Sequence, residues 1–325
     1  MTTSQRPTAD WYAQIEANAT GFLETESQSI YWEESGNPDG MPAVVLHGGP
    51  GGGSQPHYRR YFDPDRYRII QMDQRGCGRS HPHAGDWASL SGNNTWALVA
   101  DLELLRTTLK VQSWLVFGGS WGSTLALAYA QQYPERVRAL VLRGIFLIRP
   151  HELYWFYGGG GANLLFPDYW RDYCAQLDPN RPVQTAIAQY HELLEGPDRV
   201  AATDAAIAWT RWEALTSTLL PDPAHVAAAI DPRNAIAFAR IENHYFRHAA
   251  FLSPNQLLEH AGALKGIPST IVHGRYDVVC PIGNAFDLHA QLPHSELIVV
   301  DDAGHSMNET GIRRALVGAT DRFAD

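Results

Sequence analysis

LVFGGSWGSTLALAY, residues 115–129, is the stretch that decides the fold. It begins as an apolar run that favours a strand, turns through Gly118-Gly119-Ser120-Trp121-Gly122, and ends in residues that mostly favour a helix. A strand, a tight glycine turn and a helix are the context that a Gly-x-Ser-x-Gly signature requires, and this context argues against an incidental serine in a glycine-rich loop. Glycine two residues to either side lets the strand and the helix approach without Cβ clashes. We interpret Ser120 as an exposed nucleophile, with the backbone N–H of Trp121 pointing to where an oxyanion would form.

Length and composition indicate an α/β domain with an insertion. The chain has 325 residues, of which 45% are hydrophobic and 18% charged, so it can bury a large core and global disorder is not expected. The formal net charge of −10 argues against a nucleic-acid partner, because the chain has no basic stripe that could release counterions.

The sequence has no feature of a secreted or membrane protein. Residues 1–10 are polar and have no apolar core, so we expect no signal peptide, and no apolar run reaches the length of a membrane span. Cys77, Cys174 and Cys280 are scattered and form no Cys-x-x-Cys pair, which indicates neither a zinc site nor a disulfide framework. We therefore expect a cytoplasmic protein that uses no metal and no cofactor and has no membrane partner.

Alternating strand and helix patterns predict the layout of the core. Short β-prone runs at 21–25 and 29–33 predict antiparallel strands at a sheet edge, and an unbroken apolar run at 43–46 predicts a buried strand. Further strands are expected at 67–72, 115–117, 137–142, from 269, and at 296–300, with helices at 94–110, 282–291 and the C-terminus. The fold class is therefore α/β, with a mostly parallel sheet flanked by helices.

The alternation stops between residues 147 and 264. This stretch holds many Trp and Tyr residues, several Ala-rich helical runs and few β-branched clusters, so we predict an inserted helical cap. The α/β core then consists of residues 1–146 and 265–325.

Two polar loops follow the first buried strands. His47-Gly48-Gly49-Pro50-Gly51-Gly52-Gly53 can bring backbone N–H groups close to a ligand. A phosphate cradle would need the Lys of a P-loop, which is absent, whereas a serine elbow needs a second oxyanion donor, so we favour an oxyanion loop. The turn at 73–80 is assigned to structure, with Asp73 and Arg75 expected to pair with each other or with loop backbone.

A base and an acid for Ser120 are chosen by their place in the chain. Functional groups of a parallel sheet gather on loops at the carboxyl ends of strands. Two such loops follow Ser120: one carries Asp277 and the other, after the last strand, carries His305. Their order, Ser then Asp then His, is the one expected for such an elbow. We predict that His305 accepts the Ser120 proton and that Asp277 holds the imidazole in the required tautomer.

Other residues compete for these roles. His273 closes a strand and is expected to satisfy a local hydrogen bond, and His47 is expected to order the glycine loop. Asp301 and Asp302 share a loop with His305, so either could be the acid, although chain order favours Asp277. Cys280 lies near Asp277 but has no evident base, and we interpret it as a buried lining residue.

Several of these motifs together resemble the prolyl aminopeptidases, or proline iminopeptidases, of the α/β-hydrolase fold. The resemblance extends through the cap and covers most of the chain. The segments that carry it are His47-Gly48-Gly49-Pro50-Gly51, Asp73-Gln74-Arg75-Gly76, Gly118-Gly119-Ser120-Trp121-Gly122-Ser123, His273-Gly274-Arg275-Tyr276-Asp277 and Gly304-His305. It implies a serine exopeptidase that releases N-terminal proline from peptides, with Gly49 and Trp121 as oxyanion donors.

The resemblance also implies a role for two acidic cap residues. Glu213 and Glu242 are expected to recognise the free α-ammonium of the substrate, and carboxylates among aromatic residues are costly to bury unless they meet a cation. The alternative is that each pairs with Arg211 or Arg240 on a solvated helix face.

The resemblance also implies that aromatic residues line the proline ring of the substrate. They correspond here to Phe146, Phe156 and Phe246, for which ordinary core packing is the alternative. The family often has Tyr at the second position, so Phe156 is expected to alter the polarity of the pocket.

Two other functions remain open at this point: a related hydrolase of esters or other amides, and a non-catalytic binding protein on the same scaffold. The oligomeric state is left undetermined.

Overall fold

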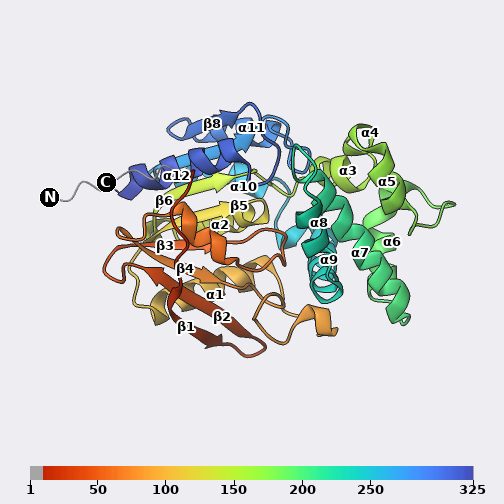
Figure 1. Ribbon diagram of the computed structural model, residues 1–325, viewed down its shortest axis with the longest axis horizontal. Coiled ribbons are helices and arrows are strands. Elements are labelled where there is room, and N and C mark those ends of the chain that lie inside the picture. Colours follow the sequence, from red (N-terminus) through yellow and green to blue (C-terminus); the bar gives the residue numbers. More distant parts are fainter. Residues whose placement is uncertain (1–9, 325) are drawn as a thin grey trace.

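A computed structural model describes residues 10–324. Its centre is an eight-stranded sheet in the order β1-β2-β4-β3-β5-β6-β7-β8 (Figure 1). The strands β3 to β8 are parallel, whereas β1 pairs with β2 and β2 with β4 in antiparallel fashion, which confirms the predicted edge. The strands are β1 (Ala17–Glu24), β2 (Ser29–Gly36), β3 (Met41–Leu46), β4 (Tyr67–Met72), β5 (Trp114–Gly119), β6 (Val137–Arg143), β7 (Ser269–Gly274) and β8 (Glu296–Val300).

The central strands are buried on both faces because their residues are apolar almost without interruption. All six residues of β5 are buried, and Val116 lies opposite Val44 of β3 and Leu140 of β6. Successive side chains point to opposite faces of the sheet. Val116 and Leu140 therefore pack on one face, while Leu115 and Ala139 pack on the other.

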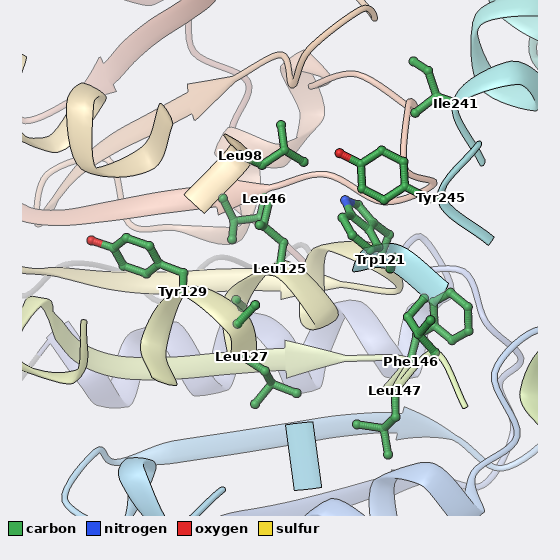
Figure 2. Packing of buried hydrophobic residues seen from close by; sticks show 14 of the residues in the cluster. Leu46, Leu98, Trp121, Leu125, Leu127, Tyr129, Phe146, Leu147, Ile241 and Tyr245 are labelled. Carbon is green, nitrogen blue, oxygen red and sulfur yellow. The ribbon is translucent and has the colours of Figure 1, made fainter. Parts of the chain in front are cut away.

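Helices cover both faces of the sheet. The face that carries Val116 is covered by α1 (Thr95–Thr108), α2 (Trp121–Gln132) and α11 (Gly283–Gln291), and Figure 2 shows Leu98, Leu125 and Leu127 packed there. The opposite face is covered mainly by α12 (Thr310–Ala324) and the short helix η1 (Pro56–Tyr61). This arrangement confirms the predicted α/β class and the helices expected at 94–110, 282–291 and the C-terminus.

The chain between β6 and β7 is helical throughout its regular elements. Helices α3 to α9 lie together at one end of the sheet (Figure 1). In contrast, α10 and the short helix η6 (Ala261–Leu264) return to the core and pack against α2. The helices of this part are α3 (Pro150–Tyr157), α4 (Ala162–Leu165), α5 (Pro167–Cys174), α6 (Ala186–Leu194), α7 (Arg199–Thr216), α8 (Pro223–Ala229), α9 (Pro232–Arg247) and α10 (Gln256–Glu259).

The longest helices of this insertion, α7 and α9, pack against each other, and the rings of Trp209 and Phe246 meet between them with centroids 6.4 Å apart. Trp209 and Trp212 of α7 and Tyr245 and Phe246 of α9 are all buried.

Residues 1–9, which include most of the polar segment for which no signal peptide was expected, lie outside the described residues. Within residues 10–324, no helix is both long and apolar enough to cross a membrane.

Candidate active site

Ser120 stands on a strained turn between β5 and α2. Its backbone has φ 57° and ψ −128°, a left-handed conformation that is costly for a residue with a side chain. Its flanking glycines are required by close approach: a Cβ at Gly118 would collide with the carbonyl oxygen of Gly122, and a Cβ at Gly122 with that of Leu46. The strand–turn–helix geometry expected from the sequence is therefore present, with Ser120 directly before the first turn of α2.

The glycine-rich loop after β3 lies against this turn. A Cβ on Gly48 would lie 3.4 Å from the Cβ of Ser120, and Gly49 lines a cavity together with Ser120. The first N–H groups of a helix have no partner within the helix, and no hydrogen bond from the N–H of Trp121 is found within residues 10–324. The structure thus brings Gly49 and Trp121 to the same hydroxyl.

His47 orders the glycine loop, as predicted. Its Nε2 accepts a hydrogen bond from the backbone N–H of Gln74 at 3.0 Å, and the Gln74 side-chain amide donates to the His47 carbonyl at 3.0 Å. The indole of Trp121 in turn donates to Oε1 of Gln74 at 2.8 Å. These bonds tie the loop after β3, the loop after β4 and the start of α2 into one unit.

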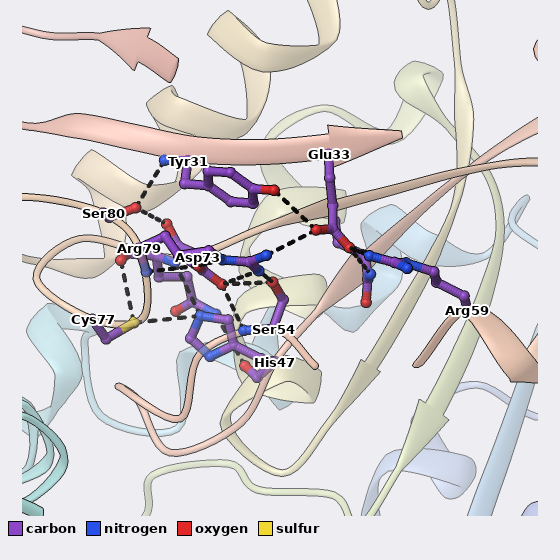
Figure 3. A network of polar contacts seen from close by, with 11 residues as sticks. Tyr31, Glu33, His47, Ser54, Arg59, Asp73, Cys77, Arg79 and Ser80 are labelled. Carbon is purple, nitrogen blue, oxygen red and sulfur yellow. Dashed lines mark hydrogen bonds and ion pairs between the residues drawn. The ribbon is translucent and has the colours of Figure 1, made fainter. Parts of the chain in front are cut away.

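The polar turn after β4 fixes the far end of the same loop (Figure 3). Asp73 accepts hydrogen bonds from the Ser54 backbone N–H at 2.7 Å and from Nε of Arg79 at 2.7 Å. Burial raises the pKa of Asp73, but Arg79 and Ser54 outweigh it and hold the pKa below its ordinary value. The predicted pairing with loop backbone is confirmed. The alternative pairing of Asp73 with Arg75 is wrong, because Arg75 extends to α1 and binds Asp101 through two hydrogen bonds.

His305 and Asp277 form a buried pair. Nδ1 of His305 lies 2.7 Å from Oδ2 of Asp277, and both residues follow the carboxyl ends of neighbouring strands. Burial lowers the pKa of His305, and Asp277 opposes this effect. Burial also raises the pKa of Asp277, but His305 and His273 outweigh it and keep the carboxylate ionised. An ionised carboxylate at Nδ1 orients the imidazole with its other nitrogen available as a base.

Of the other candidates for the acid and the base, only His273 shares a partner with the pair within the described residues: its Nε2 lies 3.3 Å from Oδ2 of Asp277. Asp301 is exposed and pairs with Arg275, and Asp302 is exposed as well. His273 satisfies local hydrogen bonds, as expected: its Nδ1 accepts from the Ile145 N–H and its Nε2 bonds the Cys280 carbonyl.

Arg143, which the sequence analysis did not select, also contacts His305. It is the last residue of β6 and is buried, and its Nη1 lies 3.1 Å from Nε2 of His305 and 2.9 Å from the His305 carbonyl oxygen. Within residues 10–324, no hydrogen bond joins the Ser120 hydroxyl to His305, although both residues line one cavity of about 470 Å³. Arg143 is the last residue of a parallel strand, and this position is the only sequence signal from which its place in the site could have been predicted.

Glu213 and Glu242 meet inside the helical insertion. They come from α7 and α9 and share Tyr157 as a neighbour, whose hydroxyl lies 3.1 Å from Glu213 and 3.4 Å from Glu242. Trp209 donates its indole N–H to Glu242 at 2.7 Å. Burial raises the pKa of Glu213 to about 7, and burial together with the charge of Glu213 raises that of Glu242 well above its ordinary value. The pair therefore retains a proton near neutral pH, and within residues 10–324 neither carboxyl group makes an ion pair with a cation.

The alternative pairing with neighbouring arginines does not describe Glu242. Arg240 turns away from it and binds Glu195 through two hydrogen bonds at 2.7 and 2.9 Å. Within the described residues, Arg211 makes no ion pair with Glu213.

A small cavity joins Ser120 to the two carboxyl groups. Its walls include all three aromatic residues selected from the sequence, and the rings of Phe146 and Phe246 make an edge-to-face contact at 5.8 Å. Tyr157, missed by the sequence analysis, stands beside Phe156 and supplies the only phenol hydroxyl bonded to the carboxyl pair within residues 10–324. Cys280 is a buried lining residue as expected, and burial raises the pKa of its thiol well above the ordinary value.

The strained serine elbow, the loop at its side and the buried His–Asp pair define a hydrolase of the α/β-hydrolase class. The family model described as "alpha/beta hydrolase fold" matches residues 42–312. Among solved structures, a bromoperoxidase from Bacillus anthracis is similar over 94% of this chain and 99% of its own, with a TM-score of 0.65 and 19% identity. An aryl esterase from Burkholderia cenocepacia, described as putative, is similar over 94% and 98%, with a TM-score of 0.63 and 17% identity. These likenesses concern the fold.

The curated relatives are more specific. A proline iminopeptidase from Xylella fastidiosa (strain Temecula1 / ATCC 700964) is 51% identical over 299 residues, which are 92% of this chain and 94% of the relative. Proline iminopeptidases from Arabidopsis thaliana and Neisseria gonorrhoeae are 50% and 45% identical, over 96% and 93% of this chain and 81% and 95% of their own lengths. The chain belongs to the proline iminopeptidase family.

Proposed function

We propose that this protein is a serine exopeptidase that releases N-terminal proline from peptides. The observation that carries the proposal is the buried pair of Glu213 and Glu242 at the end of the small cavity that begins at Ser120. A buried carboxyl pair with no cation of its own is completed by a positively charged ligand. The prolyl group of a peptide with a free N-terminus brings such a cation, the ring ammonium, close to the first carbonyl carbon.

The aromatic walls fit the rest of the prolyl group. Phe146, Phe156 and Phe246 supply apolar surface for the pyrrolidine ring, and the cavity also contacts Ser120 and the two carboxyl groups. Apolar walls with few convergent polar groups are typical of a small-molecule site. Tyr157, beside Phe156, supplies a hydroxyl to this pocket, and the effect of Phe156 on the polarity of the pocket stays a prediction.

The reaction that we propose follows the order of a serine hydrolase. His305 takes the Ser120 proton while the hydroxyl oxygen attacks the prolyl carbonyl carbon, and the N–H groups of Gly49 and Trp121 bind the oxyanion. His305 then gives that proton to the leaving amine, and the prolyl ester remains on Ser120. Water hydrolyses the ester with His305 again as base, while Asp277 stabilises the imidazolium that forms in each step.

The helical insertion limits how many substrate residues can lie on the N-terminal side of the cleaved bond. We propose that residues 147–264 act as a cap whose carboxyl pair closes the small cavity, so that one residue fits between Ser120 and Glu242. The larger cavity of about 470 Å³, on which Ser120 and Glu213 also lie, then takes the leaving peptide. We further propose that the enzyme acts in the cytoplasm, where its three free cysteines stay reduced.

Hydrolysis of a prolyl arylamide compared with its N-acetylated counterpart tests the function. The free compound is expected to be cleaved and the acetylated one not, because acetylation removes the cation that the carboxyl pair binds. Purified Ser120→Ala is the matched control for a contaminating peptidase. Equal rates on the two substrates, or faster cleavage of simple acyl esters than of prolyl substrates, would contradict the proposal and favour an esterase or a general amidase.

A further inference from the structure

The guanidinium of Arg143 is a buried charge that makes no direct ion pair within the described residues. The Arg143 side chain is only 8% exposed, and within residues 10–324 no carboxylate lies within ion-pair distance of it. Its Nε has no hydrogen-bond partner there either. An unpaired buried cation is expensive, so a cation kept at such a place has a function or a compensating set of contacts.

Within the described residues, the side-chain hydrogen bonds of Arg143 are all with His305, the proposed base. The Arg143 backbone carbonyl accepts a hydrogen bond from the Ser120 N–H at 2.9 Å. Its Nη1 donates to the carbonyl oxygen of His305 and faces Nε2 of the same residue. A Cβ on Gly119 would lie 2.7 Å from the guanidinium carbon, so the glycine before Ser120 leaves the space that the guanidinium occupies.

The chemistry of guanidinium decides the state of the imidazole. Arginine carries only donors and stays protonated in proteins. The nitrogen that faces Nη1 must therefore present its lone pair, and the single proton of a neutral imidazole must lie on Nδ1. Nδ1 faces the Asp277 carboxylate at 2.7 Å, which accepts that proton. This is the tautomer in which a histidine can act as a base toward a serine.

We propose that Arg143 is a positioning residue that holds His305 in its neutral, Nδ1-protonated form. This inference rests on the proposed role of His305 as the base for Ser120. The guanidinium anchors the His305 backbone through the carbonyl and occupies Nε2 until substrate arrives. Because Nε2 has one lone pair, the guanidinium must leave it when Ser120 delivers its proton.

Several charged groups surround His305 and Arg143. His305 faces Asp277 and His273 from β7 and its following loop, and Arg143 from β6. Arg143 itself lies near Tyr58 of η1, Glu213 of α7 and Glu309 in the loop before α12. Burial lowers the pKa of His305, Asp277 raises it, and the charges of Arg143 and His273 lower it further. Removing the Arg143 charge is therefore expected to raise the pKa of His305.

Labelling of Ser120 by a fluorophosphonate isolates this effect. The serine oxygen bonds to phosphorus and fluoride leaves, so the rate depends on His305 as base but not on the carboxyl pair that binds the ammonium. The variants are Arg143→Met, and Arg143→Gln as a second neutral variant if the first does not fold. Arg143→Lys keeps the charge but lacks the fork that reaches both acceptors. Arg106→Met is the matched control, because Arg106 is buried to a similar degree, at 7% exposure, and pairs with Glu103 on α1.

In the wild-type protein, the labelling rate is expected to fall on the acid side as His305 becomes protonated. We expect this fall, the acid limb, at a pH below the usual pKa range of imidazole. In the neutral variants this limb moves to higher pH, and the ratio of the rate at about pH 5.5 to that at about pH 8 falls roughly threefold or more. The limb stays in place in Arg143→Lys and Arg106→Met.

Three outcomes would overturn the inference. An unchanged limb in a folded neutral variant shows that Arg143 has only a structural role, even if the plateau rate falls. If neither neutral variant folds, a wild-type limb at or above the usual imidazole range has the same consequence. Absence of any labelling at Ser120 in the wild-type protein refutes the proposed serine mechanism instead, so the two failures are distinguishable.

Discussion

Substitution of Glu242 by Gln tests how the cap selects its substrate. The side chain keeps nearly the same shape and can still accept the Trp209 indole hydrogen bond, which measures 2.7 Å in the structure. The substitution removes one of the two carboxyl groups that face the bound ammonium, whereas the burial that raises the pKa of Glu213 remains. The substitution therefore leaves Glu213 as the one carboxylate of the pair that can bind the ammonium.

The expected magnitude follows from burial. Both carboxyl groups are buried, so their interaction with an ammonium is weakly screened, and removing one partner of a buried ion pair costs about 3–5 kcal/mol. Since each 1.4 kcal/mol is tenfold, kcat/KM for a prolyl arylamide is expected to fall on the order of 10²- to 10³-fold.

The assay compares two substrates of the same shape. A prolyl arylamide carries the ring ammonium, and a cyclopentanecarbonyl arylamide has a methylene in its place. Wild-type enzyme is expected to prefer the charged substrate strongly, and Glu242→Gln is expected to lose most of that preference while its rate on the neutral substrate changes little. Glu195→Gln is the control. It removes a partly exposed carboxylate that pairs with Arg240, and Arg240 lies on the helix that also carries Glu242, α9. An equal loss on both substrates would refute the reasoning, since it would show damage to the fold rather than loss of a charge.

Three further predictions follow from the site and its supports. Ser120→Ala is expected to lower kcat on the order of 10⁴- to 10⁶-fold, measured with prolyl arylamide, because members of such a triad act as a unit; a loss below tenfold would exclude Ser120 as nucleophile. The pKa of Glu213, raised by burial to about 7, means that the pair gains a proton as the pH falls through this value, so KM for prolyl arylamide should rise below about pH 7; a KM that does not change between about pH 5.5 and 8 would contradict this. Asp73→Asn is expected to lower the free energy of unfolding by about 1–3 kcal/mol in urea titrations, because the buried side chain loses its charge-assisted hydrogen bonds while Arg79, which is 40% exposed, keeps its ion pair with Glu33; Asp301→Asn on the surface should change it by less than about 0.5 kcal/mol.

The elbow could be predicted from sequence because its signal is local. Both flanking glycines are required by atoms within a few residues or on the adjacent strand β3, and the change from strand to helix is visible in the apolar pattern. The helical insertion could be predicted as a class, but not that α10 returns to pack on α2, since that depends on contacts between distant segments.

The polar partners of the site were harder to predict. Asp73 and Arg75 are close in sequence, but their side chains point to different neighbours, and only the folded arrangement shows that Arg75 reaches Asp101 on α1. The question of whether Glu242 pairs with Arg240 could have been answered from helix geometry, because residues two apart do not face each other. Tyr157 and Arg143 carry no motif, and their roles depend on which strands and helices meet around them.

The most direct test of the account is to look for the prolyl group on the enzyme during turnover. Mixing the enzyme with a prolyl ester substrate, stopping the reaction with acid within the first turnover and mapping the peptides by mass spectrometry should find one prolyl group attached to Ser120. The adduct is expected to be absent in Ser120→Ala and with an N-acetylated substrate. Release of proline by the wild-type enzyme with the prolyl group on another residue would contradict the central claim.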